Sequence, residues 1–422
     1  MARKISMKLI PALMLVAFSG VASASGFQLL EQNASGIGNA YAGSAAVAEN
    51  ASTIYFNPAG MTQLQDREVS GGISAVSPSF RFENQGSDVG AFNTSGNGGN
   101  AGGLAAIPNG YVSWALNKNL YVGVGVGAPF GLKTEYDNPW IGAAQATMFE
   151  VKTYNINPSI AYRVSDKVSL GAGLNWQRVE ATYKRQAAVV GAGPATPIKL
   201  TLDDDSWGWN VGALFSVSPS TKVGVSYRSA IQYHTEGRLD INNGGPTSVD
   251  AKAELKMPDT FIMSVTQTLS DKWEMLGDVS RTGWSSIPKV NIMDATSGSA
   301  TPAQVLDTEF RDAWRVALGA NYKYNDAWKL KFGVAYDQTP VKGAGTRLVS
   351  LPDNDRVWFS WGAQWTPSKA SRLDLGVSYI YVRDSKIDND QGSSVAAPFR
   401  GRVTGEYTGN IWLLGAQYSM SF

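Results

Sequence analysis

The stretch Trp328-Lys329-Leu330-Lys331-Phe332-Gly333-Val334-Ala335-Tyr336-Asp337 decides the fold, because its large apolar residues fall on every second position. Successive side chains of a β-strand point to opposite faces, so these apolar residues would share one face. The other face would carry lysine, glycine, alanine and aspartate. This pattern is typical of a transmembrane β-barrel strand, in which the apolar face meets lipid and the small or polar face lines the interior.

The same alternation recurs at residues 314–323 and 373–381, over lengths sufficient to cross a membrane. The last strand of the chain ends on the alternating residues Trp412, Leu414, Ala416, Tyr418, Met420 and Phe422. A C-terminal aromatic residue resembles the signal that the outer-membrane barrel-assembly machinery reads. Both features predict a barrel strand at the end of the chain.

Short polar turns alternate along the chain with longer segments that are polar or rich in glycine and proline. The short turns are residues 117–119, 165–167, 218–220, 270–271, 325–326 and 366–368. The longer segments are residues 84–108, 129–148, 187–204, 239–250, 285–308, 342–354 and 387–398. This order predicts an all-β fold, a transmembrane antiparallel β-barrel of about 14 strands over residues 67–422, with both ends in the periplasm.

Residues 1–24 have the features of a secretory signal peptide. Arg3, Lys4 and Lys8 form a basic region, residues 9–18 are apolar, and residues 22–24 form an A-x-A site, which predicts cleavage near Ala24. The apolar run of roughly ten residues is too short for a spanning helix. We therefore expect the mature protein in a bacterial outer membrane.

Composition agrees with an exported barrel. The chain has no cysteine, 45 glycines, 13 tryptophans and 17 tyrosines in 422 residues, whereas secreted soluble domains often use disulfides. Its 36 basic and 35 acidic side chains nearly balance, which gives no support to nucleic-acid binding.

Residues 25–66 have no strand period and are rich in glycine, alanine, serine and asparagine. A barrel of about 14 strands encloses more space than its own side chains fill, so we expect residues 25–66 to form a hatch, or plug, inside the lumen. Within them, Pro58 fixes φ and Gly60 permits a turn, so Asn57-Pro58-Ala59-Gly60 predicts a rigid corner. A disordered or adhesive N-terminal extension is the alternative.

Several blocks together resemble the FadL/TodX (OMPP1) family of outer-membrane transporters for long-chain fatty acids and other hydrophobic compounds. Their order and spacing cover essentially the whole mature chain. The blocks are residues 25–29, 35–43, the Asn57-Pro58-Ala59 motif, and residues 130–136, 207–212, 226–229, 310–319 and 351–358.

The resemblance implies a barrel closed by an N-terminal hatch, an outer hydrophobic groove, an internal pocket and lateral release beside a kinked third strand. In the proposed third strand, residues 120–130, Gly123, Gly125, Gly127 and Pro129 would weaken the ladder and remove a donor, as a kink requires. Alternatively, the glycines make room for neighbouring side chains in the lumen.

The resemblance also implies ligand-binding positions at Arg185, Phe27, Ala128 and Leu306. Arg185 falls where the fatty-acid members carry a pocket arginine, and its guanidinium suits a carboxylate. Ala128 and Leu306 fall at or near polar ligand contacts of those members, which neither residue can provide. This departure favours an alternative substrate class, neutral monoaromatic hydrocarbons. Phe27 and the Asn57-Pro58-Ala59 corner are the hypothesised moving parts.

These features predict passive uptake of fatty acids or similar hydrophobic molecules by a monomer that contacts outer-membrane lipid and lipopolysaccharide, without cofactor or metal. An enzyme is disfavoured because His234 is the only histidine and no serine partner is evident, so no catalytic residue is assigned. A general porin would need an open lumen with charges of both signs, which the hatch opposes. Asp203, Asp204 and Asp205 are interpreted as a solvated loop rather than a calcium site.

Overall fold

The computed structural model describes residues 26–422 except 90–94, 188–195, 243–245, 288, 297–303 and 393–399. The signal peptide predicted at residues 1–24, with its cleavage near Ala24, lies outside the described residues. Within them, no helix is both long and apolar enough to cross a membrane.

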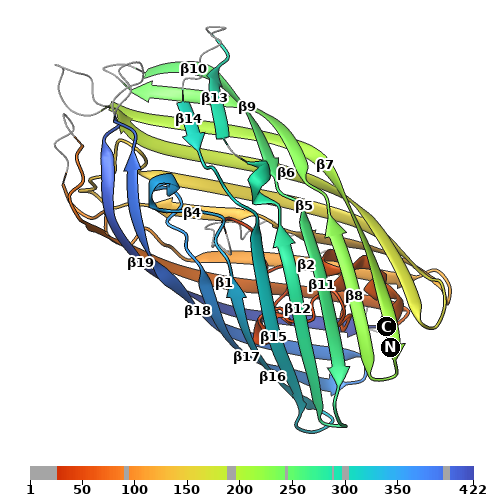
Figure 1. The fold of residues 1–422 in the computed structure, drawn as a ribbon. Helices are drawn as coiled ribbons and strands as arrows, with labels where there is room; N and C mark the ends of the chain where they lie inside the picture. The colour runs from red at the N-terminus through yellow and green to blue at the C-terminus, as the bar shows by residue number, and fades with distance from the viewer. Residues whose placement is uncertain are drawn as a thin grey trace, which may run out of the picture.

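In the described part of the chain, 19 strand segments form one closed antiparallel barrel of 14 strands, as the sequence predicts (Figure 1). β1 pairs with β2 on one side and with β19 on the other, which closes the sheet. Five barrel strands therefore consist of two segments each, namely β3/β4, β8/β9, β10/β11, β12/β13 and β14/β15.

The strand segments have the following bounds. They are β1 (Arg67–Asn84), β2 (Ala105–Ala115), β3 (Leu120–Gly127), β4 (Gly131–Glu135), β5 (Met148–Arg163), β6 (Val168–Ala187), β7 (Thr196–Ser218), β8 (Thr221–Arg228), β9 (Ile231–Asn242), β10 (Pro246–Met257), β11 (Thr260–Thr268), β12 (Trp273–Thr282), β13 (Lys289–Asp294), β14 (Gln304–Asp307), β15 (Ala313–Lys323), β16 (Trp328–Asp337), β17 (Arg356–Ser368), β18 (Ser371–Asp390) and β19 (Arg402–Ser421).

The alternation of apolar and small or polar residues in the sequence corresponds to side chains that point alternately outward and inward along the barrel strands. In β16, Trp328, Phe332 and Tyr336 are exposed on the outer surface, while Lys331 and Gly333 are buried inside. The last strand follows the same rule, and Phe422 is 64% exposed. Exposed rings and aliphatic side chains in such number suit a lipid-facing surface.

Asparagine and serine side chains close several of the short turns. Asn117 Oδ1 accepts the amides of Asn119 and Leu120, and Asn325 Oδ1 accepts those of Ala327 and Trp328. These bonds satisfy turn amides that no strand partner reaches.

The opposite end of the barrel differs from the expectation at residues 239–250. Most of this predicted loop belongs to β9 and β10, which pair with each other up to Asn242 and Pro246. Its polar composition reflects strands that continue beyond the apolar band of the barrel. Asp203, Asp204 and Asp205 likewise lie within β7 rather than in a loop, where Asp203 pairs with Arg178.

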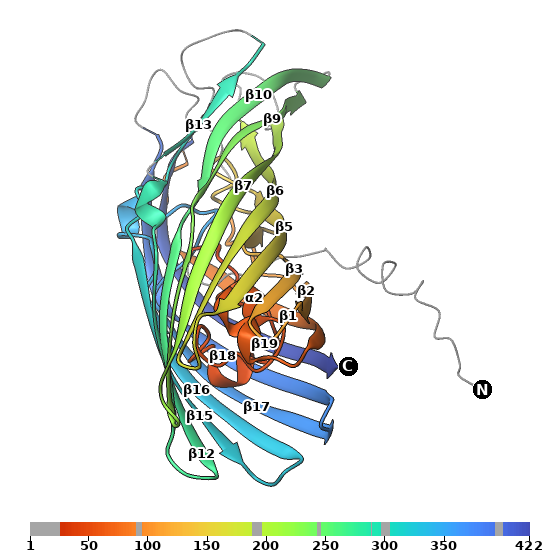
Figure 2. The same ribbon diagram turned by 90° about the vertical axis from the view of Figure 1, so that its right-hand side faces the viewer.

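The N-terminal segment, residues 26–66, lies inside the barrel toward the end that carries the short turns (Figure 2). It contains three short helices, η1 (Ile37–Asn39), α2 (Thr53–Phe56) and η2 (Pro58–Gln63). In the rest of the described chain, two further short helices are η4 (Trp284–Ser286) and η5 (Ala344–Thr346). Gln63 accepts a bond from Lys222 near a short turn, 3.4 Å away.

Glycines of the wall make room for this segment. A Cβ at Gly333 would lie 2.1 Å from the carbonyl carbon of Asn39, and one at Gly376 would lie 2.7 Å from Ile37 Cβ. Side chains at these positions would therefore push the segment off the wall.

Gly333→Ala should destabilise the folded protein by roughly 1–3 kcal/mol, because the added methyl group overlaps backbone atoms of the N-terminal segment. Gly103→Ala is the matched control, since nothing lies within 4 Å of its added Cβ. The measurement is the temperature at which each purified variant loses its folded mobility on a gel. Equal midpoints for the two variants would contradict the close contact.

Candidate functional site

The Asn57-Pro58-Ala59 corner is bonded to both the N-terminal segment and the barrel wall. The Asn57 Nδ2 group donates to the carbonyls of Ala45, at 2.7 Å, and Ala213 in β7, at 3.0 Å. Its Oδ1 accepts the amide of Ala59 at 3.1 Å, which caps η2. Gly212 of the wall leaves room for the Asn57 side chain, since a Cβ at position 212 would lie 2.1 Å from Asn57 Oδ1. The asparagine thus shapes the corner and ties it to the wall.

Ion pairs hold the middle of the N-terminal segment to another part of the wall. Glu49 pairs with Lys331 at 2.5 Å and with Lys329 at 3.4 Å, and Lys331 also pairs with Asp374 of β18 at 2.9 Å. Although burial opposes ionisation, the two lysines hold the pKa of Glu49 well below its usual range. Removing one partner from such a buried network is costly.

The wall is interrupted between β3 and β4 at residues 128–130, which we call the β3–β4 gap. The N-terminal segment fills the hydrogen bonds of this gap from inside. The Leu29 amide donates to the Pro129 carbonyl at 2.8 Å, and the Gly131 amide donates to the Phe27 carbonyl at 2.8 Å. Gln32 Nε2 adds a bond to the Ala128 carbonyl at 2.7 Å. The gap is therefore closed by backbone that does not belong to the wall.

An apolar cavity lies in the lumen on the long-loop side of the N-terminal segment, and we call it the lumen cavity. Its volume is about 80 Å³. Its lining residues are Phe27, Phe149, Val151, Ala181, Tyr183, Leu200, Leu202, Leu255, Lys256, Met257, Ile287, Val290, Ile292, Leu306, Thr308, Phe310, Leu348, Ser350 and Leu351.

The polar groups of the lumen cavity are mostly engaged with the protein itself. The Tyr183 hydroxyl donates to the Gln145 carbonyl, and the Thr308 hydroxyl donates to the Ile287 carbonyl. Lys256 alternates with the inward-facing Leu255 and Met257, so its side chain belongs to the outer face of β10. The cavity is thus built to hold an apolar molecule.

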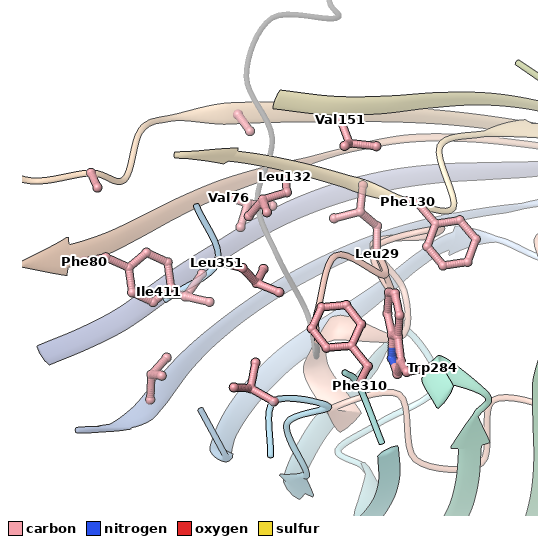
Figure 3. Close-up of a cluster of buried hydrophobic side chains, with 14 of the residues drawn as sticks. Leu29, Val76, Phe80, Phe130, Leu132, Val151, Trp284, Phe310, Leu351 and Ile411 are labelled. Atoms are coloured by element: carbon pink, nitrogen blue, oxygen red, sulfur yellow. The ribbon is translucent and has the colours of Figure 1, made fainter. Parts of the chain in front are cut away.

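Aromatic rings join the lumen cavity to the β3–β4 gap. The ring of Phe27 packs edge-on against Trp284 at 4.6 Å and against Phe130 of the gap at 6.2 Å. In Figure 3, Leu29, Phe130, Trp284 and Phe310 surround the same part of the lumen. A molecule in the cavity would therefore touch the residue whose carbonyl helps to close the gap.

The predicted ligand residues divide between these two places. Phe27 and Leu306 both line the lumen cavity, whereas Ala128 lies in the β3–β4 gap, where its carbonyl accepts Gln32. Gly123, Gly125 and Gly127 all belong to β3, and Pro129 belongs to the gap.

Arg185 lies beside the lumen cavity rather than in its lining. It follows Tyr183 by two residues on the same inward face of β6, toward the long loops, and its side chain is 6% exposed. Arg400 is buried nearby, close enough to interact electrostatically with Arg185. Two guanidinium groups thus lie at the outer edge of an apolar space.

Sequence reasoning missed Arg400 and Trp284. Arg400 follows a segment without strand periodicity, and Trp284 lies in the short helix η4, so neither position carries a pattern that aims it inward. The available signal in the sequence was a basic residue just before the last strand.

Glu31 gives the N-terminal segment a buried carboxyl group close to Arg315 and Arg356 of the wall. Burial raises the pKa of Glu31 to about 7, against the opposing effects of Arg356 and Arg315. By contrast, His234 is exposed on β9, where its ring lies 3.9 Å from Glu254.

Asn57→Ala should loosen the N-terminal segment, because the variant loses the bonds to Ala45, Ala213 and Ala59. The free energy of local opening should fall by roughly 1–3 kcal/mol, measured by hydrogen exchange of amides in residues 45–60. Asn410→Ala, on the outward face of β19, is the control. Exchange that stays the same in both variants would show that the corner does not anchor the segment.

Comparison with known proteins places these features in a family context. The family model described as outer membrane protein transport protein (OMPP1/FadL/TodX) matches residues 15–422. The long-chain fatty acid transport protein of Escherichia coli strain K12 is 27% identical over 445 residues, which cover 94% of each chain.

Two solved structures share the fold. A Pseudomonas aeruginosa FadL homologue superposes with a TM-score of 0.86 at 22% identity, covering 94% of this chain and 100% of that one. The Pseudomonas putida toluene transporter TodX gives a TM-score of 0.69 at 16% identity, covering 96% of this chain and 100% of that one.

Proposed function

Because this chain belongs to the OMPP1/FadL/TodX family of outer membrane transport proteins, we propose that it takes up long-chain fatty acids or similar hydrophobic molecules across the outer membrane. The observation that carries this proposal is the position of Phe27. Its ring lines the lumen cavity, and its carbonyl accepts the Gly131 amide at the β3–β4 gap. Ligand binding and lateral release thereby share one residue.

Burial of apolar surface supplies the binding energy. Each buried methylene contributes about 0.8 kcal/mol, so the aliphatic and aromatic lining can hold an acyl chain without further contacts. The molecule first binds among the outer loops and then enters the lumen cavity. Transport needs no energy source when the molecule moves down its concentration gradient.

Release requires a second state of the protein that binds the ligand less well, since a ligand shifts only an equilibrium between states that it distinguishes. A ligand that displaces the Phe27 ring pulls on the bonds of Phe27 and Leu29 to the gap. With those bonds broken, the gap opens sideways between β3 and β4 and the ligand leaves into the membrane. Of the two moving parts hypothesised from the sequence, only Phe27 moves in this proposal. The corner at Asn57, which is bonded to Ala45 and Ala213, and the Glu49 ion pairs stay in place.

Arg185 and Arg400 favour a fatty acid as the substrate. A carboxylate at the outer edge of the lumen cavity would lie beside two guanidinium groups, the side chains best suited to bind it in a bidentate manner. The E. coli relative is named for long-chain fatty acid transport. Leu306 leaves the opposite side of the cavity without a polar contact.

Neutral monoaromatic hydrocarbons are the second candidate, because Phe27, Phe149 and Phe310 offer ring contacts within the lumen cavity. In either case we propose a monomer that contacts outer-membrane lipid and lipopolysaccharide and carries out transport rather than catalysis.

Arg185→Ala should weaken binding of palmitate by roughly 10- to 100-fold through loss of a charge-assisted bond, and leave methyl palmitate and toluene within about twofold. The measurement is equilibrium binding to the purified protein in detergent. Arg178→Ala is the control, since Arg178 pairs with Asp203 on the outer face of the barrel. Equal losses for acid and ester would remove Arg185 from the headgroup site.

A further inference from the structure

Glu31 is a buried carboxyl group to which the proposed function gives no role. Its side chain is 1% exposed, and its Oε2 atom has no hydrogen-bond partner among the described residues. A buried carboxylate that is ionised normally pairs with a cation or accepts hydrogen bonds. Glu49 of the same segment has that arrangement, since two lysines pair with it. The two carboxyl groups of one segment therefore have different surroundings.

A row of charged side chains on the wall faces Glu31. Arg315 of β15 is the cross-strand partner of Asp337 of β16, which is in turn the partner of Arg356 of β17. All three side chains are buried and close enough to interact electrostatically with Glu31. Arg356 also pairs with Asp353, which lies just before β17.

The formal charges of this row balance without Glu31. Two aspartates offset the two arginines, so an ionised Glu31 would add one buried negative charge that has no counterion. The phenols of Tyr41 and Tyr55 also lie near Glu31, but burial raises the pKa of both and keeps them uncharged. Burial is accordingly the largest influence on Glu31 and raises its pKa to about 7. Near neutral pH the group exists both with and without its proton.

Glu31 lies in the chain between two residues that close the β3–β4 gap. The Leu29 amide and Gln32 Nε2 donate to carbonyls of the gap at 2.8 and 2.7 Å. In the closed sheet of 14 strands, β15 is seven strands away from β3/β4, on the opposite side of the barrel. Residues 29–32 therefore contact the gap through Leu29 and Gln32 and face the opposite wall through Glu31.

We propose that Glu31 is a proton-binding site that controls the seal of the β3–β4 gap: residues 27–32 stay in place while the proton is bound, and its loss favours their release. Release of Leu29 and Gln32 shifts Glu31 and admits water from the lumen. This water accepts the proton and hydrates the carboxylate. The part of the gap in ligand release rests on the proposed function, whereas the proton site rests on the side chains themselves.

The sealed state favours the protonated form of Glu31. Its pKa in the sealed state is about 7, whereas a hydrated carboxyl group keeps the ordinary value of 4.5. The sealed state therefore binds the proton more tightly than the released state does. Sealing is most favourable below pH 4.5 and weakens as the pH rises to about 7. At higher pH both states are ionised, and the balance between them no longer changes.

Hydrogen exchange of the purified protein without ligand tests the proton site. The amides of Leu29 and Gly131 donate the two seal bonds, and their protection is taken relative to intrinsic exchange at the same pH. We expect this protection to fall roughly ten- to hundredfold between about pH 5 and pH 8. Glu31→Gln, which resembles the protonated group, should keep the protection high at both pH values. Glu83→Gln, at an exposed position of β1, is the matched control and should behave like the unchanged protein.

Two results of the exchange experiment would overturn the proposal. One is equal protection of the seal amides at both pH values in the unchanged protein, a result that does not depend on the folding of any variant. The other is a fall in protection that persists in Glu31→Gln.

Uptake into vesicles that contain the protein separates this inference from the proposed function. Methyl palmitate is the ligand, because its own charge does not change with pH. The unchanged protein should take it up roughly tenfold faster at about pH 8 than at pH 5, and Glu31→Gln should stay slow at both. No uptake at either pH, together with pH-dependent protection, would support the proton site and contradict the proposed function. Uptake that ignores pH while protection follows it would overturn the control of release by Glu31.

Discussion

The two backbone hydrogen bonds between the N-terminal segment and the β3–β4 gap are the interaction on which the rest of the structure depends. A barrel wall in lipid must satisfy every backbone donor and acceptor, because water is absent and each unsatisfied group costs several kcal/mol. At residues 128–131 the wall cannot do this alone, because the ladder between β2 and β3 ends at Val126 and leaves the Pro129 carbonyl and the Gly131 amide without a strand partner on that side. Phe27 and Leu29 supply the missing partners. The gap is thus sealed only while these residues stay in place.

The other attachments of the N-terminal segment explain how such a seal could be released without loss of the whole plug. Glu49 is paired with Lys331 and Lys329 at one part of the wall, and Asn57 is bonded to Ala213 at another. Breaking those contacts would expose buried charges and amides, which is costly. The contacts of Phe27, Leu29 and Gln32 with the gap involve neutral groups and ring packing. Motion is therefore least costly next to the lumen cavity, where we propose that a ligand binds.

The sequence predicted the barrel well because the lipid imposes a strict rule on every strand. Apolar residues at alternate positions, as in β16, indicate a transmembrane strand once the segment is long enough to cross a membrane. The rule weakens where the strands leave the bilayer, and residues 239–250 were therefore wrongly assigned to a loop. For the same reason, Asp203, Asp204 and Asp205 were assigned to a loop, although they lie within β7.

The candidate site was less predictable because its residues are brought together by contacts between distant strands. Phe27 and Leu306 were named from the family resemblance, and both line the lumen cavity. Arg400 and Trp284 have no periodic pattern around them. Arg228 stands in a block noted from the sequence, but its bonds to Asn157 and Asn175 form only when β5, β6 and β7 surround it.

A disulfide across the seal tests the coupling between cavity and gap most directly. Gln28 and Phe130 are opposite residues in an antiparallel bridge, the kind of pair whose Cβ atoms lie within disulfide range, and the chain has no cysteine of its own. In Gln28→Cys/Phe130→Cys, the account predicts that the oxidised protein still binds palmitate but does not pass it into vesicles, and that reduction restores uptake. Equal uptake in the oxidised and reduced forms would contradict release through the β3–β4 gap.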